Sequence, residues 1–208
     1  MPKVMIPVNN KPTLGHVIDY WKKYTNDFVF VVGYKKENVI DYVKKLPINA
    51  EFVEQKELNG IASALLLVED LVPEKFLVTL GDCLYDGDFN VEQDVDQCVG
   101  VYKTKNKEEI KLNYSIEIGN DNYLFRVVEK PKVLVNDLCG MGVYLFKKRV
   151  FEYIRKTPAS DLRNEVEITD VIENMIEGGE KIAPAFFDGN YINLTYPEDI
   201  KKAENIFH

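Results

Sequence analysis

The chain has 208 residues, a hydrophobic fraction of 46% and a formal net charge of −8. This length predicts a single domain over residues 1–208 with enough apolar residues for a substantial core. The negative charge disfavours a nucleic-acid partner, which normally selects a basic surface. No apolar run approaches the roughly 20 residues that a membrane helix needs, so a membrane partner is not expected.

Cysteine and histidine are scarce, and the chain has only Cys83, Cys98, Cys139, His16 and His208. The three cysteines are odd in number and far apart, which argues against a disulfide framework or a zinc site. Free thiols fit a reducing cytoplasm, and Met1–Val8 lacks the long apolar stretch of a signal peptide. Two histidines also disfavour a histidine-based zinc site or a Ser-His-Asp triad.

The first half of the chain alternates apolar runs with amphipathic helical patterns. The spacing of apolar residues predicts helices over about 12–24, 39–46 and 61–70. Short apolar runs predict buried strands over 28–33, 50–53 and 76–80. This alternation is typical of βαβ units and a parallel sheet, in which ligands bind at the carboxyl ends of the strands.

The second half has a partly antiparallel character. Apolar runs predict strands over 98–102, 113–118, 123–129, 142–146 and 181–187. The turn sequence Asn120-Asp121-Asn122 separates two of these strands. Helices are expected over 148–156, over 167–177 before Gly178-Gly179, and over 197–206, which begins with a proline.

Asp82 is the strongest single candidate for a functional residue. It follows a predicted buried strand directly after Gly81, and a glycine there would let a ligand approach. A carboxylate at such a position can hold a hard cation against phosphates. The alternative is an aspartate that merely begins a turn.

Other candidates lie at predicted strand ends. In Glu129-Lys130-Pro131, the lysine can neutralise a phosphate and the glutamate can accept from sugar hydroxyls, or the segment is an exposed strand end. Gln55 could meet a base edge, and Gly60 would allow close approach to a helix start. The alternative is that the small residues of segment 60–64 only pack a helix against the sheet. Asp86-Gly87-Asp88 is a DxD triplet of the kind that binds metal in glycosyltransferases, although it reads more readily as an acidic turn.

The order of the motifs resembles one family across nearly the whole chain. The segments that carry the resemblance are PKVMIPV at 2–8, VVGY at 31–34, EQ at 54–55, GIASAL at 60–65, LVTLGD at 77–82, VEKP at 128–131, GVYLF at 142–146, EVEITD at 165–170, and YIN at 191–193 with PED at 197–199. In this order they resemble the sugar-1-phosphate nucleotidyltransferases, and most of all the members similar to glucose-1-phosphate thymidylyltransferase.

The resemblance implies a Rossmann-like α/β/α sandwich with a mixed, mostly parallel central sheet. It implies transfer of a nucleotidyl group from an NTP, dTTP or another, to a sugar 1-phosphate, with release of pyrophosphate and Mg²⁺ as cofactor. Carried over residue by residue, Asp82 and Asn193 would hold the metal, and Lys3 and Lys130 would contact phosphates. Gln55 and Gly60 would contact the base, Glu129 the sugar, and Gly142 would line the sugar pocket.

The sequence departs from the family at two places. The family has a strand and a GGxGTR loop before the PK motif, whereas Met1 directly precedes Pro2-Lys3 here. Either the chain is a truncated form of an enzyme, and the missing loop leaves the activity of the chain as written in doubt, or another segment fills the place of the lost strand, for which Val4–Val8 is the candidate. The family's second metal-binding aspartate also aligns with Asn193, which carries no charge.

Two alternatives to an active enzyme stay open. One is a non-catalytic relative that binds nucleotide sugars or has a regulatory role. The other is a metal-dependent glycosyltransferase that uses Asp86 and Asp88, against which the EKP and EITD motifs argue. The sequence names neither the base nor the sugar, and it leaves open whether the protein is a homo-oligomer.

Overall fold

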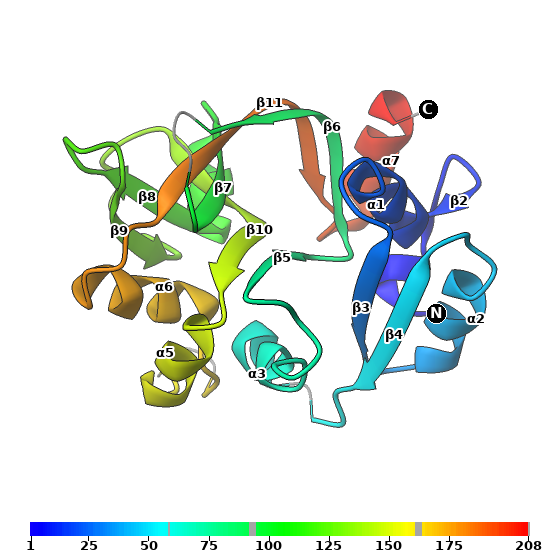
Figure 1. Ribbon diagram of the computed structural model, residues 1–208. Coiled ribbons are helices and arrows are strands. Elements are labelled where there is room, and N and C mark those ends of the chain that lie inside the picture. Colours follow the sequence, from blue (N-terminus) through cyan, green and yellow to red (C-terminus); the bar gives the residue numbers. More distant parts are fainter. Residues whose placement is uncertain (58, 92–94, 161–163, 208) are drawn as a thin grey trace. The chain divides into compact units, whose positions relative to one another are not determined.

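The computed structural model describes residues 1–57, 59–91, 95–160 and 164–207. Contacts divide the chain into two compact units, each assembled from separate stretches (Figure 1). The first unit comprises Met1–Leu58, Thr79–Asp88 and Gly189–His208, and the second comprises Asn59–Val78 and Phe89–Asp188. The single domain predicted from length stays a prediction, and the two units are taken in turn.

The first unit is built around two parallel strands, β3 (Asp27–Val32) and β4 (Asn49–Glu54). Helices α1 (Thr13–Trp21) and α2 (Lys36–Val43) contribute apolar side chains to the same core. The buried members of this core are Leu14, Ile18, Val32, Val39 and Val43. The strand–helix alternation predicted from the first 54 residues is therefore confirmed, because each helix buries its apolar stripe in this core.

The N-terminal segment does not form the strand predicted over Val4–Val8. Lys3–Met5 form a 3-10 turn, η1, in which the Met5 N–H donates to the Pro2 carbonyl at 3.0 Å. Within Val4–Val8 only Pro7–Val8 forms a strand, β1, which pairs antiparallel with β2 (Lys11–Pro12). Prolines at positions 2 and 7 lack the N–H that a central strand needs, so the prediction of a sheet strand here was wrong.

The turn between β1 and β2 is tied to the last helix of the chain, α7 (Pro197–Ile206). Asn9 and Asn10 adopt left-handed backbone with φ of 47° and 65°, as a tight hairpin turn requires. The Asn9 side-chain amide donates to the Glu204 carbonyl at 2.8 Å and to the Phe207 carbonyl at 2.6 Å. Carbonyls at a helix end lack intrahelical hydrogen-bond donors, and the Asn9 amide supplies donors to these two.

Asp199 caps the start of α7, and its loss should destabilise the first unit. Its Oδ2 accepts from the Thr195 and Tyr196 N–H groups at 2.9 and 2.8 Å. We expect Asp199→Ala to cost about 1 kcal/mol in the free energy of unfolding, measured by urea titration. The exposed Glu198, one residue earlier, offers a matched control, and Glu198→Ala should change stability by less than about 0.5 kcal/mol.

The pH dependence of this cap follows from the pKa of Asp199. Burial opposes ionisation, but the N–H groups of Tyr196 and Thr195 and the Lys202 ammonium outweigh it and lower the pKa. A lowered folded-state pKa stabilises the protein above the unfolded pKa, and this contribution disappears as the pH falls through the folded value. The difference between wild type and Asp199→Ala should therefore shrink in acid, and a constant difference would contradict the cap.

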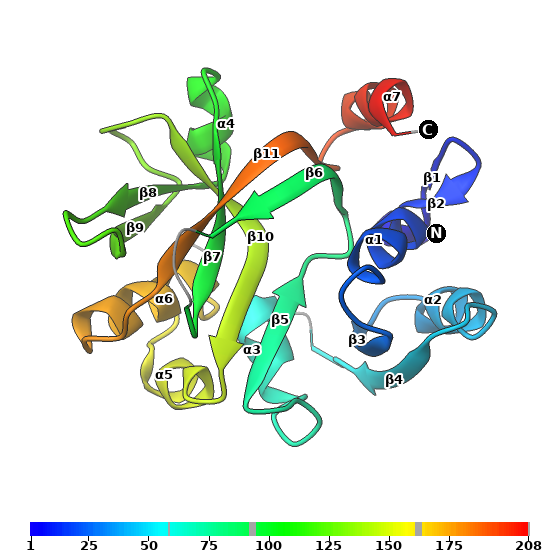
Figure 2. The ribbon, with the colours of Figure 1, turned by 45° about the horizontal axis from the view of Figure 1, so that its top comes forward.

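The sheet of seven strands has the order β6-β11-β7-β10-β8-β9, with β5 beside β10 (Figure 2). The strands are β5 (Lys75–Thr79), β6 (Cys83–Asn90), β7 (Cys98–Lys103), β8 (Tyr114–Ile118), β9 (Leu124–Glu129), β10 (Leu138–Lys147) and β11 (Ala183–Asn193). β11 runs parallel to β7, whereas β10 runs antiparallel to β7 and β8, and β8 antiparallel to β9. The mixed sheet is confirmed. The sheet is less parallel than the mostly parallel sheet that was expected, because the pairs β7–β10, β10–β8 and β8–β9 are all antiparallel.

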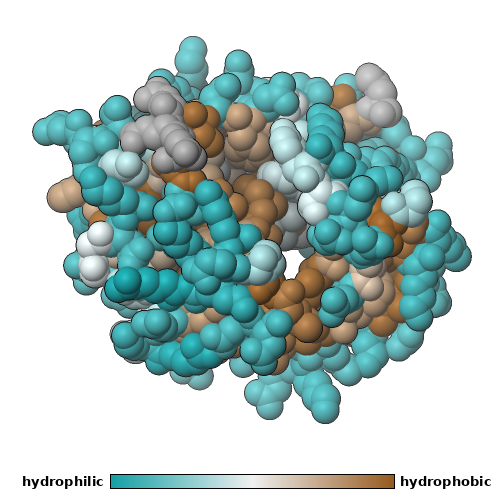
Figure 3. Space-filling model, viewed as in Figure 1, coloured by the Kyte–Doolittle hydropathy of each residue, from teal (hydrophilic) through white to brown (hydrophobic). Residues whose placement is uncertain are grey.

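Helices α3 (Gly60–Leu66), α5 (Val150–Lys156) and α6 (Ile168–Glu177) pack with the core of the second unit, and the short α4 (Lys107–Leu112) precedes β8. Phe76 and Phe151 stack in this core with ring centroids 5.5 Å apart. The visible surface of α5 and α6 is largely hydrophilic (Figure 3).

The helix predicted over 61–70 ends at Leu66, and α4 and β6 were not predicted. Across the described ranges, no helix is long and apolar enough to cross a membrane.

Candidate active site

Asp82 lies in the first unit, between the end of β5 and the start of β6. Its Oδ2 is 2.7 Å from Nζ of Lys3 on the η1 turn, and the two side chains are 22% and 44% exposed. Gly81 makes this approach of η1 feasible, since a Cβ there would lie 3.1 Å from Cγ1 of Val4. The glycine before Asp82 therefore makes room for the N-terminal turn, and two predicted site residues, Lys3 and Asp82, are in contact.

Asn193, the other predicted metal ligand, ends β11 beside Asp82. The next residue, Leu194, donates its backbone N–H to the Asp82 carbonyl at 3.0 Å. The Oδ1 atom of Asn193 is buried and has no hydrogen-bond partner among the described residues. A buried acceptor without a donor is costly unless a cation or another donor meets it, so this atom fits a metal ligand.

The Asp82 and Asn193 pair suits a cation that is shared with a substrate. The described part of the chain contains no cluster of three or more His, Cys, Asp or Glu side chains that could hold a metal alone. Mg²⁺ commonly takes one or two protein oxygens and completes its shell with water and substrate phosphates. One carboxylate and one amide oxygen therefore match this mode of binding and not that of a closed structural site.

A buried group of side chains that the sequence analysis missed supports these two residues. Cys83 is fully buried, and its Sγ lies 3.2 Å from the hydroxyl of Tyr191, two residues before Asn193. The Tyr85 and Tyr191 rings are 5.6 Å apart, which joins β6 to β11 a second time. Burial raises the pKa of the Cys83 thiol to about 12, so the thiol is neutral at pH 7 and packs instead of reacting. The sequence feature that could have indicated this group is Tyr191, an aromatic residue two positions before Asn193.

Gln55 directly follows β4 in the first unit, and its backbone N–H donates to the Val32 carbonyl at 2.8 Å. It therefore lies at the carboxyl end of the parallel pair β3–β4, which is the end where ligands of such sheets bind. This confirms the predicted position of Gln55 at a strand end. Its contact with a base stays a prediction.

The sugar-side candidates lie in the second unit. Glu129 ends β9, and its Oε2 accepts from Oγ1 of Thr169 at 3.4 Å. Lys130 follows with a left-handed φ of 44°, held by its N–H, which donates to the Asn113 carbonyl at 2.8 Å. A non-glycine residue in this conformation is uncommon and such residues gather at functional sites.

Gly60 begins α3 with φ of 91°, and Glu165 lies against it. A Cβ at position 60 would be 3.0 Å from Cδ of Glu165. The EVEITD segment therefore contacts two predicted site residues, through Glu165 at Gly60 and through Thr169 at Glu129. The sequence of this segment alone indicates no role for it, because nothing local in it identifies either neighbour.

Gly142 lies inside β10, where the pairing with β7 changes register between Gly140 and Tyr144. The neighbouring Gly140 faces the buried ring of Tyr114, whose hydroxyl donates to the Met141 carbonyl at 2.7 Å. The regular strand pairing is interrupted at this point, and such interruptions can redirect side chains. The predicted role of Gly142 in lining a sugar pocket stays a prediction.

The predicted site residues fall into two groups that belong to different units. Lys3, Gln55, Asp82 and Asn193 lie in the first unit, and Gly60, Glu129, Lys130 and Gly142 lie in the second. Lys3 meets Asp82, and Asn193 is one residue from a backbone contact with Asp82. The convergence of the two groups on one cleft stays a prediction.

The DxD triplet forms no turn and is not part of the Asp82–Asn193 pair. Asp86, Gly87 and Asp88 lie within the extended strand β6, so the predicted acidic turn was wrong. Oδ2 of Asp86 accepts from the Asn190 amide at 3.3 Å. A Cβ at Gly189 would lie 2.2 Å from the Asp86 carbonyl, so β11 approaches closely and keeps this segment extended.

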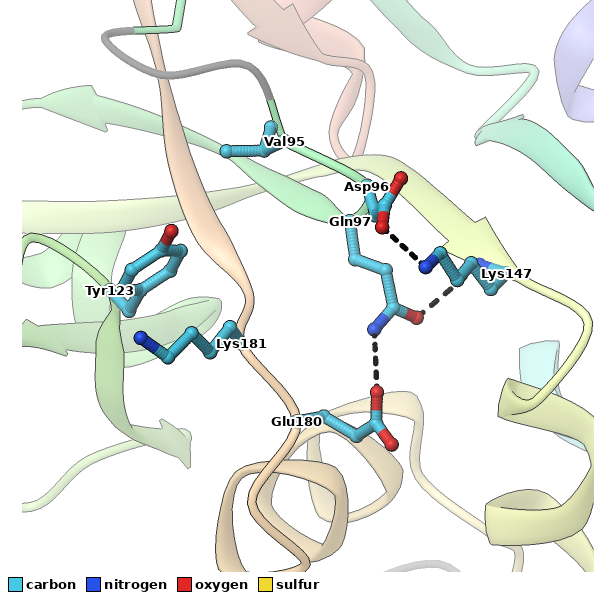
Figure 4. A pocket seen from close by; sticks show the side chains of 7 residues that line it. All are labelled: Val95, Asp96, Gln97, Tyr123, Lys147, Glu180 and Lys181. Carbon is cyan, nitrogen blue, oxygen red and sulfur yellow. Dashed lines mark hydrogen bonds and ion pairs between the residues drawn. The ribbon is translucent and has the colours of Figure 1, made fainter.

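A polar pocket of about 290 Å³ lies in the second unit at the end of the sheet where β7 begins (Figure 4). Its wall includes the buried Gln97, whose amide donates to Glu180 at 3.0 Å, and the Lys147 ammonium beside Asp96. Lys181 lies 4.7 Å from the ring centre of Tyr123. The nearest β9 residue, Leu124, is five residues before Glu129, which is about 17 Å along a strand. The pocket is therefore distinct from the Glu129 region, and its charges largely pair with one another.

The chain is similar to one family of known proteins along almost its whole length. A family profile described as nucleotidyl transferase matches residues 1–204. The chain is 34% identical to the bifunctional protein GlmU of Methanocaldococcus jannaschii over 202 residues, which cover 97% of this chain and 48% of that protein. It is 32% identical to the UTP–glucose-1-phosphate uridylyltransferase AglF of Haloferax volcanii over 213 residues, which cover 98% of this chain and 86% of that protein.

Two solved structures share the fold. A UDP-glucose pyrophosphorylase in complex with UDP-glucose matches with a TM-score of 0.82 at 22% identity, covering 99% of this chain and 89% of that one. The inositol-1-phosphate CTP transferase of T. maritima matches with a TM-score of 0.80 at 19% identity, covering 99% and 86%. The chain spans about half the length of several curated relatives, the GlmU proteins. The profile match over nearly every residue, together with the relative AglF, shows that the chain belongs to the nucleotidyl transferase family of enzymes.

Proposed function

We propose that the protein transfers a nucleotidyl group from a nucleoside triphosphate to a sugar 1-phosphate. A phosphate oxygen of the sugar phosphate forms a bond to the α-phosphorus of the nucleotide. The bond from the α-phosphorus to the bridging oxygen breaks, and pyrophosphate leaves with the electron pair. The observation that supports this most directly is the Lys3–Asp82 contact beside the buried acceptor of Asn193, in a chain of this family.

The chain's own residues would position the reactants and balance their charge. Asp82 and Asn193 would hold Mg²⁺, which when bound would supply positive charge to the triphosphate. Lys3 and Lys130 would each offer an ammonium group to phosphate oxygens. Such reactions need little covalent chemistry from the protein, so fixed charges and geometry account for most of the catalysis.

The remaining residues would recognise the two organic groups. Glu129 would accept hydrogen bonds from sugar hydroxyls, and its bond from Thr169 would hold the carboxylate in place. Gln55 offers both a donor and an acceptor to a base edge. Gly60, at the start of α3, would contact the base as well. Gly142 would line the sugar pocket.

For the base, UTP and dTTP are the first candidates. The relative AglF is named as an enzyme that acts on UTP and glucose 1-phosphate, and the sequence motifs resemble thymidylyltransferase-like members. The three free cysteines, Cys83, Cys98 and Cys139, support a reducing compartment, and we propose the cytoplasm.

Lys130→Met should lower kcat/KM for pyrophosphate release by about 10²–10³, because a preorganised positive charge is lost from the transition state. The assay couples pyrophosphate release to a colour reaction, with UTP, dTTP, ATP, GTP and CTP against glucose, mannose and N-acetylglucosamine 1-phosphates. Methionine keeps the length of the side chain and meets the same backbone strain at φ of 44°. Lys132→Met is the matched control, since Lys132 is exposed two residues later and should leave kcat/KM within about twofold.

Equal kinetics in Lys130→Met and wild type would refute the role of Lys130. Binding of a nucleotide sugar without pyrophosphate release from any pair would instead favour the non-catalytic relative. Two observations argue against the glycosyltransferase alternative. Asp86 lies in a strand and accepts a hydrogen bond from Asn190, and the chain belongs to the nucleotidyl transferase family.

A further inference from the structure

In the proposed function Lys3 would contact the nucleotide phosphates, and in the structure it contacts Asp82. Its Nζ lies 2.7 Å from Oδ2 of Asp82, within hydrogen-bond distance. Asp82 is also the one charged member of the proposed metal pair, since Asn193 contributes a neutral amide. An ammonium and a divalent cation therefore compete for the same carboxylate oxygen, while the nucleotide phosphates need the ammonium as well.

The Lys3–Asp82 contact is suited to exchange. Lys3 is 44% exposed at its side chain and projects from a turn of three residues, so its long side chain has water on one side. Ion pairs in such surroundings are weak and screened, and a doubly charged ion can displace the single charge. Asp82 itself is fixed, since its carbonyl accepts from Leu194 and Cys83 begins a buried strand.

We infer that Lys3 and the divalent cation occupy the Asp82 carboxylate in turn. In the metal-free protein, Lys3 neutralises Asp82 and keeps the carboxylate oriented. With a cation bound, Asp82 and Asn193 would be its ligands, and the Lys3 ammonium would be free to contact the nucleotide phosphates. Lys3 would thus reach the nucleotide once Asp82 holds the cation. This exchange rests on the proposed function, because it controls when Lys3 can reach the nucleotide phosphates.

The test measures Mn²⁺ binding to the metal-free protein by electron paramagnetic resonance and calorimetry, without nucleotide. The titration extends to about millimolar Mn²⁺, because two protein oxygens alone bind a cation weakly. Lys3→Met removes the competing charge, so the Kd for Mn²⁺ should fall about two- to fivefold, although pyrophosphate release should also fall. Lys3→Arg keeps the charge and should bind Mn²⁺ like wild type. Lys11→Met is the matched control, since Lys11 pairs with Asp19, an exposed carboxylate of the same unit that is not a proposed ligand.

The double variant Lys3→Met with Asp82→Asn should lose the tightened Mn²⁺ binding, which assigns the gain to Asp82. Unchanged or weaker Mn²⁺ binding in Lys3→Met, an equal gain in Lys11→Met, or no measurable Mn²⁺ binding by any variant would each overturn the exchange. Turnover decides the proposed function separately: the Mn²⁺ pattern without turnover contradicts only the proposed function, and turnover without the pattern contradicts only the exchange.

Discussion

Asp82→Asn is expected to abolish the Mg²⁺ dependence of nucleotide binding and to lower turnover at least about 100-fold. The substitution keeps the shape of the side chain but removes its charge. Both proposed metal ligands would then be neutral amides, and a hard divalent cation binds those more weakly than a carboxylate. Calorimetry of UTP binding, with Mg²⁺ and with EDTA, measures the first effect, and the pyrophosphate assay measures the second.

Asp86→Asn is the matched control for Asp82→Asn, because Asp86 is an exposed aspartate of β6 four residues later. Its removal should change metal-dependent binding by no more than about twofold. If Asp82→Asn binds Mg·UTP like wild type, then Asp82 is a turn residue that only pairs with Lys3. The reverse pattern, with loss in Asp86→Asn alone, would revive the glycosyltransferase alternative.

Gly140→Ala should destabilise the protein by about 3 kcal/mol or more, which is at the upper end for overpacking a core. A Cβ at this position would lie 1.9 and 2.0 Å from two ring atoms of Tyr114. That ring is buried and its hydroxyl is bonded to the Met141 carbonyl, so it has little freedom to move. Thermal unfolding should show a fall in Tm of roughly 6–12 °C for a chain of this size.

Gly179→Ala separates crowding from backbone strain. Position 179 has a left-handed φ of 85° but no atom within 4 Å of an added Cβ. Its substitution should therefore cost only about 1 kcal/mol, from the strained backbone alone. A Gly140→Ala protein as stable as Gly179→Ala would contradict the packing of Tyr114 against β10.

Local patterns predicted the fold best where one element carries its own signals. The last helix was predicted over 197–206 and spans Pro197–Ile206, because a proline begins it and apolar residues recur at helical spacing. β3 was likewise clear from its apolar run. β6 was missed because its sequence, CLYDGDFN, contains acids and a glycine that locally favour a turn. Its pairing with β11, about one hundred residues later, decides its conformation.

The candidate site was predictable as residue types in order, and less so as contacts. The motifs indicate Lys3, Asp82 and Asn193, and the structure brings the Lys3 ammonium to Asp82. The contact between Glu165 and Gly60 could not be foreseen, since it joins segments about a hundred residues apart. The support that Cys83 and Tyr191 give to Asp82 was hidden for the same reason.

The bonds from Asn9 to the end of α7 bear on how the first unit opens in solution. Local opening of a protein proceeds in cooperative segments, and hydrogen bonds that join two segments make them open together. The β1–β2 turn and the final helix share the two bonds that Asn9 donates to Glu204 and Phe207. Fraying of the last helical turn therefore also frees the hairpin next to Lys3, so amide exchange at the two extremes of the chain is coupled into one sub-global event.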